Sequence, residues 1–236
     1  MVLMFFPTIY IDPAFCALAL AVVLSIFLLL DLFRASQLPP ISRPLTHFLA
    51  PYVDGRDHRG PVIISHIFLL IGCSIPLWLS LADIPRTGSS PWMGWNVLSR
   101  DVSMISGLVC VGLGDAAASL VGRRFGRHKW LWGGGKSLEG SIAFAAAVSC
   151  GLIFARIYLS IGRWPISGSE SQTNFSWLWA IVKAILAAGG ASTTEAILTG
   201  CNDNVVVPVV LWLLRIDKTR VCMAGANGIR AMRDGH

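Results

Sequence analysis

Five long apolar stretches dominate this sequence of 236 residues. They run from Ala14 to Phe33, Pro61 to Ala82, Val102 to Val121, Ser141 to Leu159 and Phe175 to Leu198. A helix needs about 20 mostly apolar residues to cross the roughly 30 Å hydrocarbon core of a bilayer. Because backbone polar groups in lipid must be paired within the segment, we expect each stretch to be a transmembrane helix. A sixth run, Val205 to Leu214, is shorter and contains Pro208, so its status as a span stays open.

The composition supports the same fold class. Hydrophobic residues make up 54% of the chain and charged residues only 14%, whereas an average soluble domain carries roughly 25% charged residues. These values exclude a water-soluble globule, and the abundance of large apolar residues excludes a disordered chain. We therefore predict an all-α, polytopic helical membrane protein with five to six transmembrane helices.

The formal net charge of +6 bears on partners and on orientation. The basic residues lie between apolar stretches and do not form one face, which argues against nucleic acid as a partner. They are densest after the third stretch, at Arg123, Arg124, Arg127, Lys129 and Lys136. Since Lys and Arg near short loops collect on the cytosolic side, we expect this loop in the cytosol. Alternation then places the turn at residues 201–204 on the same side.

Three acidic residues lie inside or beside apolar stretches, where an ionised group is costly unless it has a partner or a task. Asp115 lies in the third stretch, Glu195 near the end of the fifth, and Asp203 just before the sixth run. The third and fifth stretches run in the same direction, so we expect the acids to converge at one cytosolic mouth. Carboxylate oxygens suit Mg²⁺, which completes its shell with water and substrate phosphates. Alternatively, the acids only neutralise buried charge, Asp115 with Arg123 or Arg124 and Glu195 with Lys183.

The loop after the third stretch contains a candidate phosphate site. Its central residues are Gly133, Gly134, Gly135, Lys136 and Ser137. Glycines let backbone N–H groups approach an anion closely, the lysine adds a point charge, and Ser137 can cap the helix that follows. The spacing does not match a Walker A loop, because Trp130 stands where that motif requires glycine. The alternative is a basic loop that fixes the topology and touches anionic headgroups.

Several short motifs together resemble the catalytic half of the dolichol kinase family. They are Asp54 to Pro61, Ser65-His66-Ile67-Phe68-Leu69-Leu70, Gly114-Asp115-x-x-Ala118-Ser119, Gly122-Arg123-Arg124-x-Gly126-Arg127, Lys136-Ser137-Leu138-Glu139-Gly140, and Asn202-Asp203-Asn204 with Pro208. Each motif alone is weak. The resemblance is specific because all of them follow the order of the family over about residues 50–212.

The resemblance implies a multi-pass enzyme of the endoplasmic reticulum membrane that phosphorylates dolichol with CTP and a divalent metal such as Mg²⁺, giving dolichyl phosphate for protein glycosylation. It also implies that the loop at 122–140 binds the CTP phosphates on the cytosolic face. The residues implied are Arg123, Arg124, Arg127, Gly133, Gly134, Gly135, Lys136, Ser137, Glu139 and Gly140. Asp115 and Asp203 match acidic positions shared with the phosphatidate cytidylyltransferases, where they look like metal ligands. Asp115, Lys136 and Asp203 are thus the expected catalytic residues.

Two features set this chain apart from the family pattern. Gly134 and Gly135 precede Lys136, where many members carry threonine and a second basic or polar residue. The chain is also expected to cover about half the usual length, without the N-terminal spans of the family. We divide it into an N-terminal span and linker (1–50), a catalytic membrane domain (51–216) and a basic tail (217–236).

Three alternative functions stay open at this point. The nearest is a cytidylyltransferase, which would use the same nucleotide and metal but attack the α-phosphorus with a lipid phosphate. A second is a kinase of phytol or another prenol. The third is a transporter or a non-catalytic membrane subunit, in which the acids would serve ion coupling.

Overall fold

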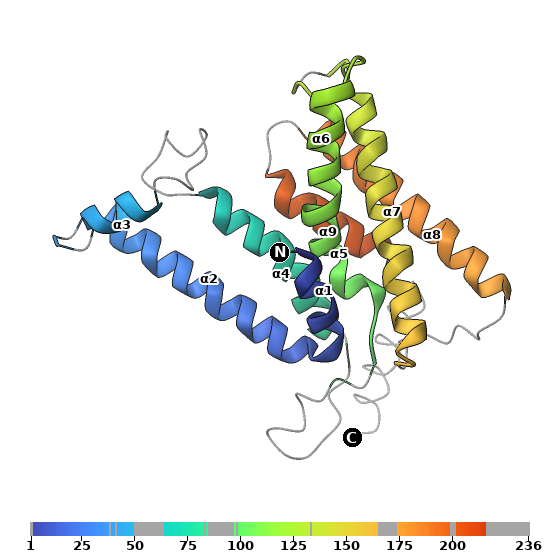
Figure 1. The fold of residues 1–236 in the computed structure, drawn as a ribbon, viewed down its shortest axis with the longest axis horizontal. Coiled ribbons are helices and arrows are strands. Elements are labelled where there is room, and N and C mark those ends of the chain that lie inside the picture. Colours follow the sequence, from blue (N-terminus) through green and yellow to red (C-terminus); the bar gives the residue numbers. More distant parts are fainter. Residues whose placement is uncertain are drawn as a thin grey trace, which may run out of the picture.

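The computed structural model describes residues 2–37, 39–40, 42–49, 64–82, 84, 97, 99–132, 134–164, 174–198 and 202–215. Within these ranges the regular structure is helical and contains no strand. The elements in chain order (Figure 1) are α1 (Val2–Ile11), α2 (Pro13–Ala35), α3 (Ser42–Leu49), α4 (Ile64–Ala82), the 3₁₀ helix η4 (Val102–Ile105), α5 (Ser106–Val109), the π-helix η5 (Cys110–Gly114), α6 (Asp115–Phe125), α7 (Leu138–Ile161), α8 (Asn174–Ile197) and α9 (Asp203–Arg215). The all-α fold class is therefore confirmed.

Four helical segments in the described part of the chain are long and apolar enough to cross a membrane. They are Pro13–Ala35, Val102–Phe125, Leu138–Ile161 and Trp177–Ile197. The other two apolar runs form the shorter helices His66–Ala82 and Asp203–Leu214. The chain is thus a multi-pass membrane protein. With 13 residues, α9 is about 20 Å long, which is shorter than the hydrocarbon core of a bilayer.

The third predicted span is not a uniform α-helix. Asp101 caps its start, because its side chain accepts a hydrogen bond from the Ser103 backbone N–H at 3.2 Å. Farther along, η5 forms a π turn in which the backbone N–H of Asp115 donates to the carbonyl of Cys110, five residues earlier. Such turns hold one residue more than an α turn and often lie at functional sites. Residues 102–109, before the π turn, are buried, whereas α6, which follows it, contains no buried residue.

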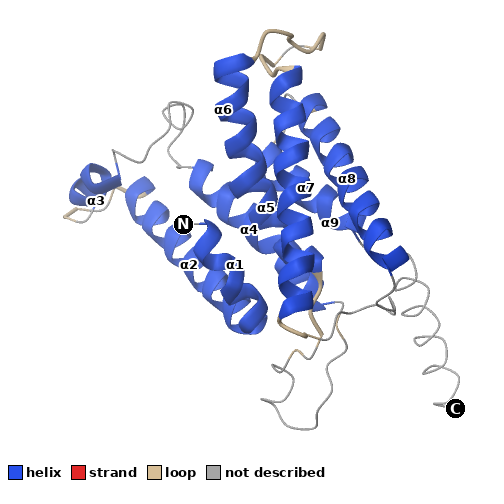
Figure 2. Ribbon diagram, turned by 45° about the vertical axis from the view of Figure 1, so that its right-hand side comes forward, coloured by secondary structure: helices blue, strands red, loops and turns tan. Residues whose placement is uncertain are grey.

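Helices α6, α7 and α8 stand side by side, and the loop between α6 and α7 lies at one end of them (Figure 2). Glycines permit the close contact of η5 and α6 with α7. A Cβ at Gly114 would lie 2.7 Å from Cε2 of the buried Phe144, and one at Gly140 would lie 3.2 Å from the Ala118 carbonyl oxygen. This close packing fixes α6 against the first half of α7.

The N-terminal helices share the apolar core of the rest. Tyr10 of α1 is fully buried and stacks on Tyr158 of α7, with ring centroids 6.0 Å apart. The guanidinium of Arg100 donates to the Tyr10 carbonyl oxygen at 2.6 Å, near the end of α1. Helix α2 leans away from the bundle in Figure 1, and Trp78 of α4 holds it by donating to the Ala17 carbonyl at 3.1 Å. The core therefore extends across the predicted boundary at residue 50.

Candidate functional site

A cavity of about 600 Å³ lies where the loop between α6 and α7 meets the ends of α8 and α9. Its lining residues are Asp115, Ala118, Ser119, Gly122, Arg123, Gly126, Lys129, Gly134, Gly135, Lys136, Ser137, Gly140, Ser141, Glu195, Asp203 and Asn204. The volume falls in the range of small-molecule binding sites. The lining positions on α6 recur every three or four residues, so they form one stripe along the helix.

The loop between α6 and α7 folds into a tight hairpin at the edge of this cavity. The Trp130 backbone N–H donates to the Lys136 carbonyl at 3.2 Å. Gly134 and Gly135 adopt φ angles of 77° and 71°, in the left-handed region that glycine enters without steric cost. The ammonium of Lys129 donates to the Gly135 carbonyl at 2.8 Å and holds the tip of the hairpin. Two of the predicted glycines therefore shape the turn that faces the cavity.

Glu139 closes the base of the hairpin. Its carboxylate accepts the His128 backbone N–H at 3.2 Å and 3.3 Å, and Oε1 lies 2.8 Å from Nδ1 of the same histidine. The buried Ser137 caps α7, because its Oγ accepts the Gly140 N–H at 3.2 Å. The helix cap expected at Ser137 is thus confirmed. Together these bonds fix the direction in which the chain enters α7.

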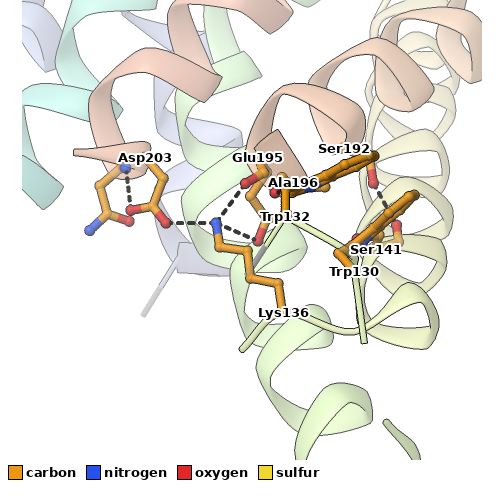
Figure 3. Close-up of polar contacts among 9 residues, drawn as sticks. Trp130, Trp132, Lys136, Ser141, Ser192, Glu195, Ala196 and Asp203 are labelled. Atoms are coloured by element: carbon orange, nitrogen blue, oxygen red, sulfur yellow. Dashed lines mark hydrogen bonds and ion pairs between the residues drawn. The ribbon is translucent and has the colours of Figure 1, made fainter. Parts of the chain in front are cut away.

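Lys136 connects the hairpin to α8 and α9 (Figure 3). Its ammonium donates to the Glu195 carbonyl oxygen at 2.7 Å and to Oδ2 of Asp203 at 3.0 Å. It also lies 3.6 Å from Oε1 of Glu195. The side chain of Glu195 is only 13% exposed and that of Lys136 23%, so water screens this charge cluster less than it screens an exposed ion pair.

Two tryptophans attach the hairpin to the bundle independently of Lys136. The Nε1 atom of Trp130 donates to Oγ of Ser141 at 3.0 Å, and that of Trp132 donates to the Ala196 carbonyl at 3.0 Å. Their rings stack with centroids 4.8 Å apart. Ser192 of α8 in turn donates to the Ser141 carbonyl at 2.7 Å. The hairpin is therefore bonded to both α7 and α8 through side chains that lie beside the cavity (Figure 3).

Three carboxylates line the same cavity, those of Asp115, Glu195 and Asp203. The Oε2 atom of Glu195 is buried, and among the described residues none donates a hydrogen bond to it. A small pocket of about 10 Å³ lies beside these acids, and its other lining residues are Cys110, Val111, Phe144, Asn204, Val207 and Pro208. The acids therefore stand between a polar cavity and a mostly apolar wall.

The sequence-based alternative in which Glu195 pairs with Lys183 is wrong. Lys183 precedes Glu195 by 12 residues on α8, which separates them by about 18 Å along the helix axis. The Lys183 ammonium lies over the ring of Trp179, 6.0 Å from its centroid. Glu195 instead contacts Lys136, which reaches it from the hairpin.

The structure divides the predicted nucleotide-binding residues into two groups. Those that line the cavity are Arg123, Gly134, Gly135, Lys136, Ser137 and Gly140. Arg124 and Arg127 lie outside the lining, and the Arg124 guanidinium packs over the Phe125 ring at 5.7 Å. Glu139 belongs to the base of the hairpin. Gly133 falls outside the described residues, as does the motif from Asp54 to Pro61.

Some lining residues were not named individually as site residues from the sequence, although three of them lie in the loop at 122–140 that the resemblance implies for the CTP phosphates. They are Ala118, Ser119, Gly122, Gly126, Lys129, Ser141 and Asn204. Lys129 is one of several basic residues in this loop, so the sequence alone does not distinguish it from its neighbours. Ser119 follows Asp115 by four positions, a spacing that places both side chains on one helix face. That spacing was available in the sequence.

The lining residues suit a divalent cation of the Mg²⁺ type. Such an ion requires only one or two protein carboxylates, because water and substrate phosphates supply its other ligands. The unpartnered Oε2 of Glu195 and the carboxylates of Asp115 and Asp203 are oxygen donors of this kind. No group of three or more His, Cys, Asp or Glu side chains in the described ranges is arranged to hold a metal alone. A cation at this site would therefore depend on ligands from a substrate.

Comparison with known proteins identifies relatives over most of the chain. Dolichol kinase sec59 of Schizosaccharomyces pombe is 36% identical over 216 residues, which cover 90% of this chain and 36% of that protein. The dolichol kinase of Saccharomyces cerevisiae is 34% identical over 214 residues, covering 89% of this chain and 34% of its own length. CTP-dependent diacylglycerol kinase 1 of Schizosaccharomyces pombe is 31% identical over 121 residues, which cover 50% of this chain and 52% of that protein.

No protein-family model matches the chain, and no solved structure matches it significantly. The chain spans about a third of the length of the dolichol kinases that it matches, less than the half expected from its motifs. The resemblance itself is confirmed, because 90% of the chain aligns with a dolichol kinase at 36% identity. Over most of its length, this chain is therefore homologous to the dolichol kinases.

Proposed function

We propose that this chain forms the site that transfers the γ-phosphoryl group of CTP to dolichol, on the cytosolic face of the endoplasmic reticulum membrane. The observation that carries the proposal is the contact of Lys136 with Asp203 and Glu195 at a cavity edged by a glycine hairpin. The homology to dolichol kinases supports dolichol as acceptor. The similarity to a CTP-dependent diacylglycerol kinase supports CTP as donor.

The cationic residues of the cavity would bind the triphosphate. Arg123, Lys129 and Lys136 all line it, and their charges offset those of phosphate oxygens. Phosphoryl transfer passes through a loose transition state, so positioning and charge stabilisation matter more than covalent chemistry. Arg124 and Arg127 would then act at the membrane surface and not on the nucleotide.

Asp115 and Asp203 are the residues that we assign to hold Mg²⁺, with Glu195 as a third oxygen donor beside them. When bound, the ion would neutralise charge on the phosphates of the nucleotide. Asp203 is also our candidate for accepting the proton of the acceptor hydroxyl, since its side chain is 35% exposed in the cavity. Because the transition state is loose, strong base catalysis is not required for this step.

The acceptor hydroxyl would approach from the apolar side of the carboxylates. The small pocket there is walled by Val111, Phe144, Val207 and Pro208, so the carboxylates border an apolar surface on that side. A polyisoprenoid tail cannot leave the hydrocarbon region without exposing its apolar surface to water. The tail would therefore remain between helices while the hydroxyl reaches the carboxylates.

The purified chain, incubated with dolichol, Mg²⁺ and radiolabelled CTP, tests this proposal. Label that moves from the γ position to the lipid supports the kinase. Label that moves from the α position to a lipid phosphate supports the cytidylyltransferase alternative. Absence of labelled lipid with every acceptor would contradict an enzymatic role and favour a transporter or a non-catalytic subunit.

Diacylglycerol is a second candidate acceptor, favoured by the relative that is 31% identical over half of this chain. The same labelled reaction with dolichol and diacylglycerol in competition separates the two candidates. A kinase of dolichol should keep labelling dolichol when diacylglycerol is in excess. Other prenols can be tested as acceptors in the same mixture.

A further inference from the structure

Lys136 occupies two of the carboxylate oxygen atoms that the site would offer to a divalent cation, one on Asp203 and one on Glu195. Its ammonium lies 3.0 Å from Oδ2 of Asp203 and 3.6 Å from Oε1 of Glu195. Both carboxylates line the cavity with Asp115. A lysine ammonium and a metal ion cannot both lie close to the same oxygen without strong repulsion, because like charges a few ångströms apart interact strongly in a partly buried site.

The Lys136 ammonium also donates to the Glu195 carbonyl oxygen at 2.7 Å, but the hairpin does not depend on Lys136 for its attachment to the bundle. The hairpin is attached by the bonds from Trp130 to Ser141 and from Trp132 to Ala196. Its base is closed by Glu139. Lysine is a flexible point charge with rotatable donors, and it binds phosphate as well as carboxylate. The same ammonium can therefore serve carboxylates or phosphates while the surrounding backbone stays in place.

We propose that Lys136 is an internal counter-cation, which competes with the divalent cation for Asp203 and Glu195 and moves onto the nucleotide phosphates when the nucleotide binds. The inference rests on the proposed function, because it needs a nucleotide and a metal at this cavity. It adds a coupling between the two ligands. Metal binds weakly as long as Lys136 holds the carboxylates, and nucleotide strengthens metal binding by drawing Lys136 away. Linkage requires the metal to strengthen nucleotide binding by the same factor.

Lys129 provides a matched control for this role. It carries the same charge and lines the same cavity, but its ammonium donates to the backbone carbonyl of Gly135 at 2.8 Å. Replacing either lysine by methionine removes one positive charge from the cavity and keeps a similar side-chain length. Only the change at Lys136 removes the competitor from the carboxylates.

The test measures Mn²⁺ binding to the full chain in nanodiscs of neutral phosphatidylcholine, by electron paramagnetic resonance and without nucleotide. We expect Lys136→Met to bind Mn²⁺ about tenfold more tightly than the unaltered protein, within the usual range of coupling between sites. Lys129→Met should change the affinity by less than about threefold. Lys136→Arg keeps the charge and should bind Mn²⁺ as weakly as the unaltered chain.

A second titration adds a CTP analogue with a methylene bridge between the β and γ phosphorus atoms. The analogue should tighten Mn²⁺ binding by the unaltered protein more than by Lys136→Met, once binding by the analogue alone is subtracted. Equal or weaker Mn²⁺ binding by a Lys136→Met protein with unchanged thermal stability would overturn the inference. Binding of Mn²⁺ by no variant, with or without the analogue, would overturn it as well.

The two proposals fail separately. The labelled reaction reports phosphoryl transfer, and the resonance titration reports metal binding with no turnover. Tight Mn²⁺ binding by Lys136→Met together with no labelled lipid would contradict the kinase but leave the competition intact. Labelled lipid with unchanged Mn²⁺ affinity in Lys136→Met would support the kinase and contradict the competition between Lys136 and the metal.

Discussion

The ammonium of Lys136 lies 3.0 Å from Oδ2 of Asp203, although 67 positions separate the two residues in the sequence. One belongs to the hairpin that precedes α7, and the other is the first residue of α9. The contact therefore joins the hairpin to a helix that follows it only after two further helices.

Replacement of Lys136 by alanine should raise the KM for CTP by about 10- to 100-fold, because a charge-assisted bond to phosphate is lost. The effect on kcat should be smaller. Steady-state kinetics with labelled CTP provides the measurement. Lys183→Ala is the control, since Lys183 lies over Trp179 on α8 and outside the cavity lining. An unchanged CTP dependence in Lys136→Ala would argue against the phosphate-binding role.

Asp115→Asn should reduce turnover by at least about 100-fold, the typical cost of removing one charge-stabilising group from an active site. The side chain is exposed in the cavity, so we expect the thermal melting temperature to change little. Asp101→Asn is a control at the other end of the same span, where the side chain caps η4. Normal turnover by Asp115→Asn would remove it from the catalytic site.

Trp132→Phe should loosen the hairpin, because it removes the N–H that donates to the Ala196 carbonyl. A lost hydrogen bond of this kind costs about 1 kcal/mol. Limited trypsin digestion at Arg127 and Lys129 should then become several times faster, in proportion to the opened population. Trp179 on α8 has the same 52% exposure, and Trp179→Phe should leave the cleavage rate unchanged. Equal rates in both variants would contradict this attachment of the hairpin.

Gly114→Ala should destabilise the packing of η5 against α7. The added methyl group would meet Phe144 Cε2 at 2.7 Å and Val148 Cγ2 at 2.8 Å, and overpacking of this kind costs about 1–3 kcal/mol. Gly189 of α8 offers the matched change, since a Cβ there meets nothing within 4 Å. Gly189→Ala should be neutral or stabilising, because alanine favours helix by about 1 kcal/mol over glycine. Thermal melting in detergent compares the two variants, and equal melting temperatures would contradict the packing argument.

The long helices follow from apolar length, and that signal is strong enough to predict the fold class. The sequence reasoning missed α1 and α3, which are short and lie outside the predicted spans. It also treated Val102–Val121 as one uniform span. The π turn η5 at Cys110–Gly114 contacts α7, and the apolar run alone does not indicate where such a turn falls.

The selection among the arginines shows a second limit of sequence reasoning. Arg123 and Arg124 are adjacent, so on α6 they point about 100° apart. Arg123 lines the cavity, whereas Arg124 packs over Phe125. The two side chains carry the same charge, so charge alone does not distinguish them. Their positions relative to Asp115 do distinguish them. Arg123 follows Asp115 by eight positions, which is two steps of four along one helix face, whereas Arg124 lies one residue farther around the helix.

The π turn at Cys110–Gly114 joins a buried segment of the membrane helix to α6, which contains no buried residue. Each residue of an α-helix advances the chain by about 100° around the axis. The additional residue in the π turn therefore rotates α6 by that angle relative to the segment before it. Removal of a single residue from this turn would swing Asp115 and Ser119 out of their shared line with the hairpin, without changing any side chain of the site. The rotation of α6 about its axis is therefore as important for the geometry of the site as the acidic residues themselves.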